Sequence, residues 1–253
     1  MTNFSLAGKI ALVTGGRQGI GETLSLAFAE AGADLALCDL VDDGKLEAVA
    51  GEVQKMGRRA FTVAKVDTSR KEDVDRMVQK VIDHYGRIDI LLNNAGIIIK
   101  SPILDVAEKD WDRLFAVDLK GYFLCAQAVG KRMIERKKGV IINLASQWAY
   151  KTAPGFGAYS IAKAGVVMLT RVLAREWGKF GIRANTLAPA MVITDFSKDT
   201  WTNPAALKQI EASLPLGRAA ETKDLVGAAL LLASDASSYV TGHTLVLDGG
   251  ALA

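Results

Sequence analysis

The chain has 253 residues, of which 50% are hydrophobic and 23% are charged, which predicts a sizeable core and excludes a mainly disordered chain. The formal net charge of +3 is too small to indicate a nucleic-acid partner. No apolar run approaches the roughly 20 residues that cross a bilayer, so we expect no membrane partner either.

Cys38 and Cys125 lie far apart in apolar runs, as reduced core residues do, and the N-terminus has no signal-peptide pattern. Both features predict a cytoplasmic protein. No Cys/His cluster has metal-ligand spacing, so we expect no metal site.

A buried strand over 9–14 is followed by a glycine-rich turn from Thr14 to Gly21 and a helix over 22–31. Glycines let the backbone turn sharply and let a phosphate approach the helix N-terminus, where free N–H groups favour anions. The spacing G-x-x-x-G-x-G differs from the usual dinucleotide pattern G-x-G-x-x-G. An ordinary tight turn is therefore the alternative to a phosphate site.

A second strand ends at Asp39, which lies 18 residues after Gly21. An acid roughly 20 residues beyond the glycines binds the ribose 2′-hydroxyl of NAD and would repel the 2′-phosphate of NADP. Asp39 therefore favours NAD. Arg17 is a counter-argument because a cation can accept that phosphate, and Asp42 or Asp43 could take the place of Asp39.

Strands and helices continue to alternate along the chain. The predicted elements, starting with the second strand, are strand 34–39, helix 45–56, strand 60–66, helix 70–85, strand 88–92, helix 111–137, strand 140–144, a helix from near Tyr159, strand 183–187, helix 223–232 and strand 244–247. This alternation predicts an α/β fold with a doubly wound parallel sheet and helices on both faces. No linker divides the chain, so we expect a single domain over 1–253.

Ligands of such sheets bind beyond the carboxyl ends of the strands. Polar or glycine-rich positions follow the first five predicted strands, namely Gly15 to Gly21, Asp39, Asp67, Asn93 to Gly96, and Ser146. We therefore expect one cleft along this edge. The Ser146 hydroxyl would position a carbonyl or alcohol oxygen of a substrate there.

Tyr159 and Lys163 lie four residues apart at the start of a helix, so they project from one face. A phenol has an unperturbed pKa of about 10. A cation a few Å away favours the phenolate and lowers that pKa, which makes the pair suitable for proton transfer. The same spacing is common by chance on solvated helices, which is the alternative interpretation.

The segment 190–215 breaks the alternation and carries aromatic and apolar residues, including Trp201. With Trp148 it would form a lid and a substrate pocket, although the same residues would suit a core or a subunit interface. Polar neighbours such as Gln147 and Lys151 favour a polyol or sugar substrate over a long acyl chain.

In this order and spacing, the motifs resemble the short-chain dehydrogenase/reductase family over 9–250. The resemblance rests on Thr14-Gly15-x-x-x-Gly19-x-Gly21, Asp67, Asn93-Asn94-Ala95-Gly96, Ser146, Tyr159-x-x-x-Lys163, Asn185-x-x-x-Pro189 and the segment from Thr241 to Gly250. It implies a Rossmann-like fold, a nicotinamide cofactor, a small alcohol or ketone substrate and a homotetramer.

The resemblance also assigns roles to residues. Tyr159 would be the acid/base, Lys163 would lower its pKa and hold the nicotinamide ribose, and Ser146 would steady the reacting oxygen. The expected catalytic set is Ser146, Tyr159, Lys163 and Asp118. The expected cofactor site is Gly15, Arg17, Gln18, Gly19, Ile20, Gly21, Asp39, Asp67, Thr68, Asn94, Tyr159, Lys163, Pro189, Val192 and Thr194. The expected substrate site is Ser146, Gln147, Trp148, Tyr159, Ala190 and Trp201.

Two positions depart from the family pattern. Asp118 stands where the family has an asparagine whose backbone carbonyl holds a water near the lysine, and an added carboxylate would bias Lys163. The family's Pro-Gly pair is Pro189-Ala190 here, so we expect the loop toward Thr194 to take a different path.

The leading hypothesis is an NAD(H)-dependent oxidoreductase that interconverts a secondary alcohol, in a polyol or sugar-like molecule, and its ketone. One alternative is an NADP-type reductase of 3-oxoacyl groups or small ketones. Another is a nucleotide-sensing protein that uses the fold without chemistry.

Overall fold

The computed structural model describes residues 4–253. Within them, seven parallel strands form one sheet in the order β3-β2-β1-β4-β5-β6-β7. The strands are β1 (Ile10–Thr14), β2 (Asp34–Cys38), β3 (Ala60–Val63), β4 (Ile90–Asn93), β5 (Gly139–Leu144), β6 (Ile182–Pro189) and β7 (Thr244–Leu247). Every residue of β1 and β4 is buried, as expected of strands covered on both faces. The predicted doubly wound α/β fold is confirmed.

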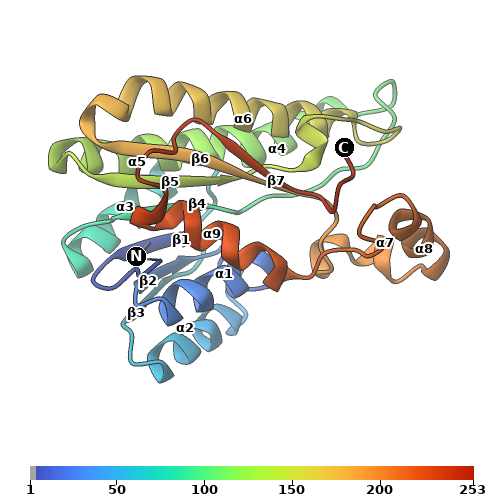
Figure 1. Cartoon of the computed structure of the whole chain (residues 1–253). Coiled ribbons are helices and arrows are strands. Elements are labelled where there is room, and N and C mark those ends of the chain that lie inside the picture. Colours follow the sequence, from blue (N-terminus) through green and yellow to red (C-terminus); the bar gives the residue numbers. More distant parts are fainter. Residues whose placement is uncertain (1–3) are drawn as a thin grey trace.

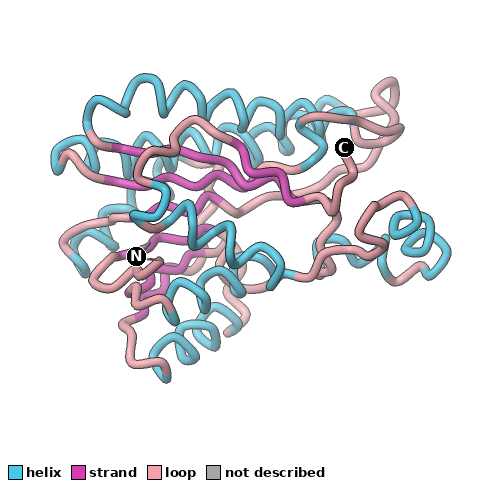
Figure 2. The backbone as a smooth tube through the Cα atoms, viewed as in Figure 1, coloured by secondary structure: helices cyan, strands magenta, loops and turns pink. Residues whose placement is uncertain are grey.

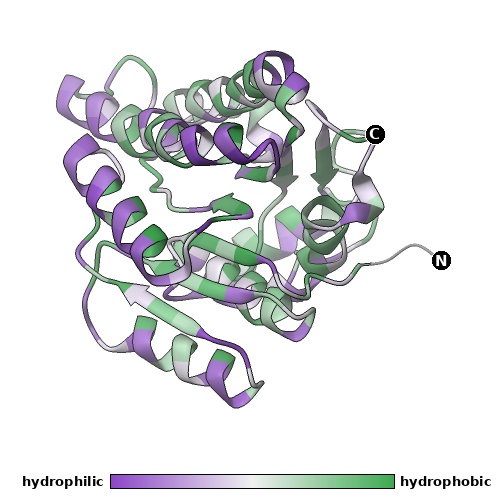
Figure 3. Cartoon of the chain, turned by 90° about the vertical axis from the view of Figure 1, so that its left-hand side faces the viewer, coloured by the Kyte–Doolittle hydropathy of each residue, from purple (hydrophilic) through white to green (hydrophobic). Residues whose placement is uncertain are grey.

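Helices cover both faces of the sheet (Figure 1, Figure 2). One core cluster joins the sheet to α1 (Gly19–Glu30), α2 (Lys45–Lys55) and α9 (Val226–Ala233). A second cluster joins it to α3 (Lys71–Tyr85), α5 (Gly121–Arg136) and α6 (Gly157–Trp177). Hydrophobic residues gather on the strands and the inward sides of these helices (Figure 3). Burial of these two apolar layers fixes the sheet edge on which the site is built.

The stretch 157–180, which is α6 and the turn after it, is long and apolar enough to cross a membrane by length and composition alone. Within the most apolar 18-residue window of this stretch, 50% is buried inside the fold. Its buried side, with Val166 and Leu173, packs into the core. We interpret α6 as a core helix.

The predicted helical stretch over 111–137 is present, but it contains a π-helical turn. The chain passes without a break from α4 (Glu108–Phe115) through this turn (Ala116–Lys120) into α5. The turn places Asp118 fully inside the protein, where its Oδ1 accepts a hydrogen bond from the Ile97 N–H at 2.8 Å. Such single π turns in helices are frequent at functional sites.

Two further segments differ from the prediction. The third strand ends at Val63 rather than at 66, because Lys65 has a left-handed φ of 58° that ends the pairing. The segment 190–215 contains two short helices, α7 (Lys198–Trp201) and α8 (Pro204–Ala212), which lie off the sheet at the right of Figure 1. They form part of the wall of the cleft described next.

Candidate active site

A cleft of ≈ 560 Å³ opens at the carboxyl ends of the strands. It runs from the glycine-rich turn and the end of β2, past the ends of β4 and β5, to the segment after β6. Most predicted site residues line it, namely Gly15, Arg17, Gln18, Gly19, Ile20, Asp39, Asp67, Thr68, Asn94, Ser146, Gln147, Trp148, Tyr159, Lys163, Pro189, Ala190, Val192 and Thr194. Gly21, Asp118 and Trp201 do not line it.

The turn between β1 and α1 needs its glycines. Gly15 and Gly19 have left-handed φ values of +65° and +62°. A Cβ on Gly21 would lie 2.0 Å from the Gly15 carbonyl oxygen, and the Asn94 Nδ2 donates to the Thr14 and Gly15 carbonyls at 3.0 and 2.9 Å. No side chain caps the first turn of α1. The close-packed backbone and the uncapped helix start fit the diphosphate of a dinucleotide.

Asp39 lies directly after β2 and is the only one of the three candidate acids, Asp39, Asp42 and Asp43, that lines the cleft. Its Oδ1 accepts from the Val41 N–H at 3.0 Å and lies 3.5 Å from Nε of Arg17. The Arg17 Nη1 also contacts Oδ2 of Asp43 at 2.5 Å. The cation that would favour a 2′-phosphate is therefore already held between two carboxylates.

Asp67 follows β3 and lines the cleft, as expected of a cofactor-site residue. Its Oδ1 accepts from the Ser69 backbone and hydroxyl, and its Oδ2 lies 3.2 Å from Nη1 of Arg113. Burial acts to raise the pKa of Asp67, but these hydrogen bonds outweigh it and the pKa is lowered. Asp67 is thus an ionised, fixed acceptor at neutral pH.

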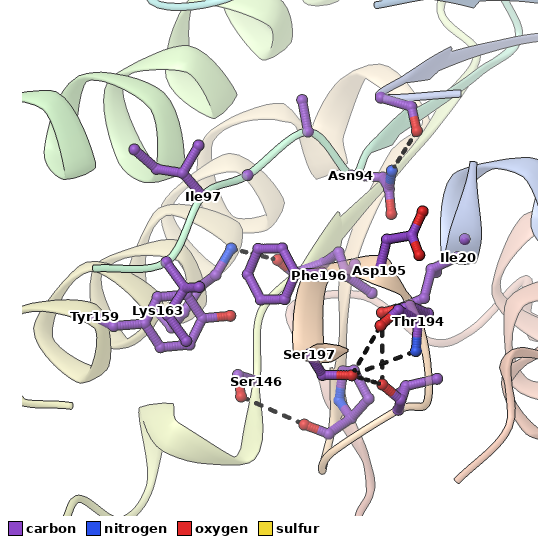
Figure 4. Close-up of a pocket in the computed structure, with 18 of the residues that line it drawn as sticks. Ile20, Asn94, Ile97, Ser146, Tyr159, Lys163, Thr194, Asp195, Phe196 and Ser197 are labelled. Atoms are coloured by element: carbon purple, nitrogen blue, oxygen red, sulfur yellow. Dashed lines mark hydrogen bonds between the residues drawn. The ribbon is translucent and has the colours of Figure 1, made fainter. Parts of the chain in front are cut away.

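Tyr159 and Lys163 project from α6 into the cleft, with Ser146 nearby (Figure 4). All three side chains are buried, and the Lys163 Nζ lies 5.5 Å from the centre of the Tyr159 ring. The Ser146 Oγ donates to the Pro189 carbonyl at 3.4 Å and accepts from the Trp148 N–H at 3.3 Å. The structure therefore brings together the three side chains on which the predicted proton transfer depends.

Burial raises the pKa of Tyr159 to about 12. The Lys163 ammonium acts to lower this pKa, as the sequence predicts, and so does a hydrogen bond with Ser146. Asp118 and Tyr122 act to raise it. The effect of the cation on the pKa of Tyr159 thus has the predicted direction, but in the protein alone burial outweighs it.

Asp118 forms a buried ion pair with Lys163, in which Oδ2 lies 3.0 Å from Nζ. Burial raises the pKa of Asp118 although Lys163 opposes it. Burial acts to lower the pKa of Lys163, but Asp118 and Tyr159 outweigh it and the pKa is raised. The Lys163 Nζ also donates to the Leu144 carbonyl at 3.2 Å and to the Tyr122 hydroxyl at 3.5 Å. The Lys163 ammonium is therefore fixed by contacts with Asp118, Leu144 and Tyr122.

Trp201, predicted as a substrate residue, does not line the cleft. Its Nε1 donates to the Thr194 carbonyl at 2.8 Å, so it anchors the segment after β6. Phe196 lines the cleft in that region instead, with its ring centre 6.4 Å from that of Tyr159. An aromatic residue in an irregular segment has no periodicity to reveal which way it points.

Trp148 lines the cleft as predicted and stacks on Phe156 at a centroid distance of 4.6 Å. Several residues that also line the cleft are absent from the predicted site, among them Ile97, Ile98, Lys100, Arg113 and Phe156. Of these five, Ile97 and Ile98 carried a signal in the sequence, because they directly follow the Asn-Asn-Ala-Gly motif.

Comparison with known proteins defines the class of this protein. Residues 15–251 match the family model described as enoyl-(acyl carrier protein) reductase. The D-threitol dehydrogenase of Mycolicibacterium smegmatis is 40% identical over 252 residues, which cover 98% of this chain and 94% of that protein. The NAD-dependent glycerol dehydrogenase of Listeria innocua is 35% identical over 248 residues, which cover 98% and 95%.

A solved structure has the same fold over its whole length. The gluconate 5-dehydrogenase from Burkholderia cenocepacia, in complex with NADP and tartrate, matches with a TM-score of 0.95 and 36% identity over 99% of this chain and 98% of that one. The fold and the relatives define an oxidoreductase that acts on alcohol and ketone groups. The chain belongs to the short-chain dehydrogenase/reductase family.

Proposed function

We propose that the protein is an NAD(H)-dependent dehydrogenase that interconverts a secondary alcohol of a polyol or sugar-like substrate and the corresponding ketone. The observation behind this proposal is the buried Tyr159–Lys163 pair beside Ser146, at one end of a cleft whose other end is the glycine-rich turn and Asp39. A proton-transfer group and a dinucleotide cradle thus share one cavity.

The residues present fit a nicotinamide dinucleotide. The turn from Gly15 to Gly21 would hold the diphosphate, Asp39 the adenosine ribose and Lys163 the nicotinamide ribose. When bound, the cofactor accepts or supplies the hydride. We infer NAD because Asp39 would repel a 2′-phosphate and because Arg17 is held by Asp39 and Asp43.

Tyr159 supplies the acid/base chemistry. In oxidation its phenolate takes the proton of the substrate hydroxyl, and in reduction its phenol returns a proton to the carbonyl oxygen. Ser146 positions that oxygen by hydrogen bonding. The Lys163 ammonium stabilises the phenolate, an effect that burial strengthens because water does not screen the charge.

The polyol or sugar-like substrate is inferred from the polar residues of the cleft. Gln147, Lys151 and Asp195 line it beside the stacked Trp148 and Phe156, so it offers both hydrogen bonds and a flat apolar wall. The names of the relatives, which act on threitol, glycerol and gluconate, support the same class.

The test follows the absorbance of NADH or NADPH with a panel of polyols, sugar acids and ketones. We expect turnover with a polyol or its ketone and a preference for NAD over NADP. Turnover confined to NADP would overturn the cofactor assignment. Measurable NADH binding without turnover on any substrate would instead favour the nucleotide-sensing alternative.

A further inference from the structure

We propose that Asp118 is a positioning residue that sets the pH range in which Tyr159 exchanges its proton, by partly neutralising the Lys163 ammonium. The inference rests on the proposed role of Tyr159 as acid/base. It concerns a carboxylate that does not line the cleft and therefore does not touch the substrate.

The Asp118 carboxylate is enclosed by protein atoms. Its side chain is 0% exposed, and its Oδ1 accepts from the Ile97 N–H at 2.8 Å. A Cβ on Gly96 would lie 3.1 Å from its Oδ2, which itself lies 3.0 Å from the Lys163 Nζ. Within residues 4–253, Lys163 is the only cation in an ion pair with it. Burial raises the pKa of Asp118, and the Lys163 ammonium beside it opposes this effect and so favours the ionised carboxylate.

Lys163 therefore faces two acids. Asp118 approaches it from the π turn and Tyr159 from its own helix, α6. Tyr122 approaches from α5 and keeps its proton, because burial raises the pKa of its phenol well above the usual value. Ser146, at the end of β5, is the neutral hydroxyl beside them. One ammonium must then stabilise two negative charges whenever Tyr159 is a phenolate.

The charge balance gives the direction of the effect. When Asp118 is ionised, the charges of Asp118, Lys163 and Tyr159 sum to zero as long as Tyr159 holds its proton. The summed charge becomes negative when Tyr159 loses that proton. With a neutral amide at position 118, loss of the Tyr159 proton takes the summed charge from positive to zero. Creating net negative charge in a buried site costs more free energy. Asp118 therefore shifts proton loss from Tyr159 to higher pH.

The shift in the pH at which Tyr159 loses its proton should be visible in the rates of both oxidation and reduction. Oxidation needs the phenolate, so its rate falls on the acid side, and reduction needs the phenol, so its rate falls on the alkaline side. Asp118→Asn removes the charge and keeps an oxygen for the Ile97 N–H. We expect it to move both limbs of the kcat/KM profiles to lower pH by the same amount, about one pH unit.

A measurement without cofactor or substrate separates this inference from the proposed function. The tyrosinate absorbance of each protein is titrated against the same protein carrying Tyr159→Phe, so that the difference belongs to Tyr159. We expect Tyr159 to titrate about one unit lower in Asp118→Asn. This shift would support the inference even if no substrate were ever turned over.

The matched control is Asp89→Asn. Asp89 is also buried and ion-paired, with Arg87 and Arg136, but its carboxylate hydrogen-bonds the Ile10 N–H at the opposite end of the sheet. We expect no shift of either limb. If Asp118→Asn does not fold, Asp118→Ser is the smaller neutral variant for the same titration. The inference would be overturned if Asp118→Asn moved neither the limbs of the kcat/KM profiles nor the titration of Tyr159. An equal shift in Asp89→Asn would overturn it as well.

Discussion

At the level of single residues, Asp39 is the side chain from which we infer the choice of cofactor. Replacing it by alanine removes the charge that repels a 2′-phosphate and leaves Arg17 with one carboxylate partner, Asp43. We expect Asp39→Ala to narrow the ratio of kcat/KM for NAD over NADP by about tenfold, which corresponds to roughly 1.4 kcal/mol.

Initial rates with both cofactors measure this ratio. Asp42→Ala is the matched control, because Asp42 pairs with Lys65 and does not line the cleft. The control should keep the ratio of the unmodified protein. If Asp39→Ala keeps it as well, Asp39 does not select the cofactor.

The sequence was sufficient to find the three side chains of the proposed proton transfer but not their electrostatics. Ser146, Tyr159 and Lys163 belong to motifs with fixed spacing, and the helix geometry brings the last two together. The pKa of Tyr159 depends on burial and on Asp118 and Tyr122, which approach from other elements. Such tertiary contacts leave no local pattern in the sequence.

At the level of elements, the turn from β1 into α1 has no room for a side chain at Gly21. Because a Cβ there would lie 2.0 Å from the Gly15 carbonyl oxygen, the backbone would have to shift. We expect Gly21→Ala to lower the free energy of unfolding by about 1–3 kcal/mol and to abolish NADH binding. Thermal unfolding and NADH fluorescence titration measure the two effects.

Gly51→Ala is the control for this substitution. Gly51 lies inside α2, and a Cβ there would have nothing within 4 Å. Alanine should therefore stabilise the helix by about 0.5–1 kcal/mol and leave NADH binding intact. Normal binding by Gly21→Ala would show that the turn does not hold the diphosphate.

Regular elements were predicted better than irregular ones. The seven strands and the alternating helices follow from hydrophobic runs and glycine stops. The π turn over Ala116–Lys120 was missed because Asp118 is held inside by the Ile97 N–H and Lys163, which lie far away in the sequence. The role of Trp201 was missed because its hydrogen bond to the Thr194 carbonyl lies in a segment without periodicity.

At the level of the whole molecule, we propose a homotetramer. Phe123 of α5 and Ile161, Met168 and Val172 of α6 are 43%, 49%, 55% and 41% exposed, although all four are large and apolar. Exposed apolar groups of this size on neighbouring helices are typical of a subunit interface. Light scattering after size exclusion should give the mass of four chains.

Met168→Glu tests where the subunits meet, because a charge in an apolar interface is costly. We expect it to reduce the assembled mass. Leu104→Glu, at a loop residue that is 91% exposed, should not change it. A single-chain mass for the unmodified protein would rule out the tetramer.

The most direct measurement is the effect of Tyr159→Phe. Phenylalanine keeps the ring beside Phe196 and over Lys163 but removes the hydroxyl that exchanges the proton. We predict that turnover of the best substrate falls by at least about 100-fold, while the affinity for NADH stays within a few-fold. If the variant keeps its turnover at full cofactor occupancy, Tyr159 is not the acid/base and the proposed chemistry is wrong.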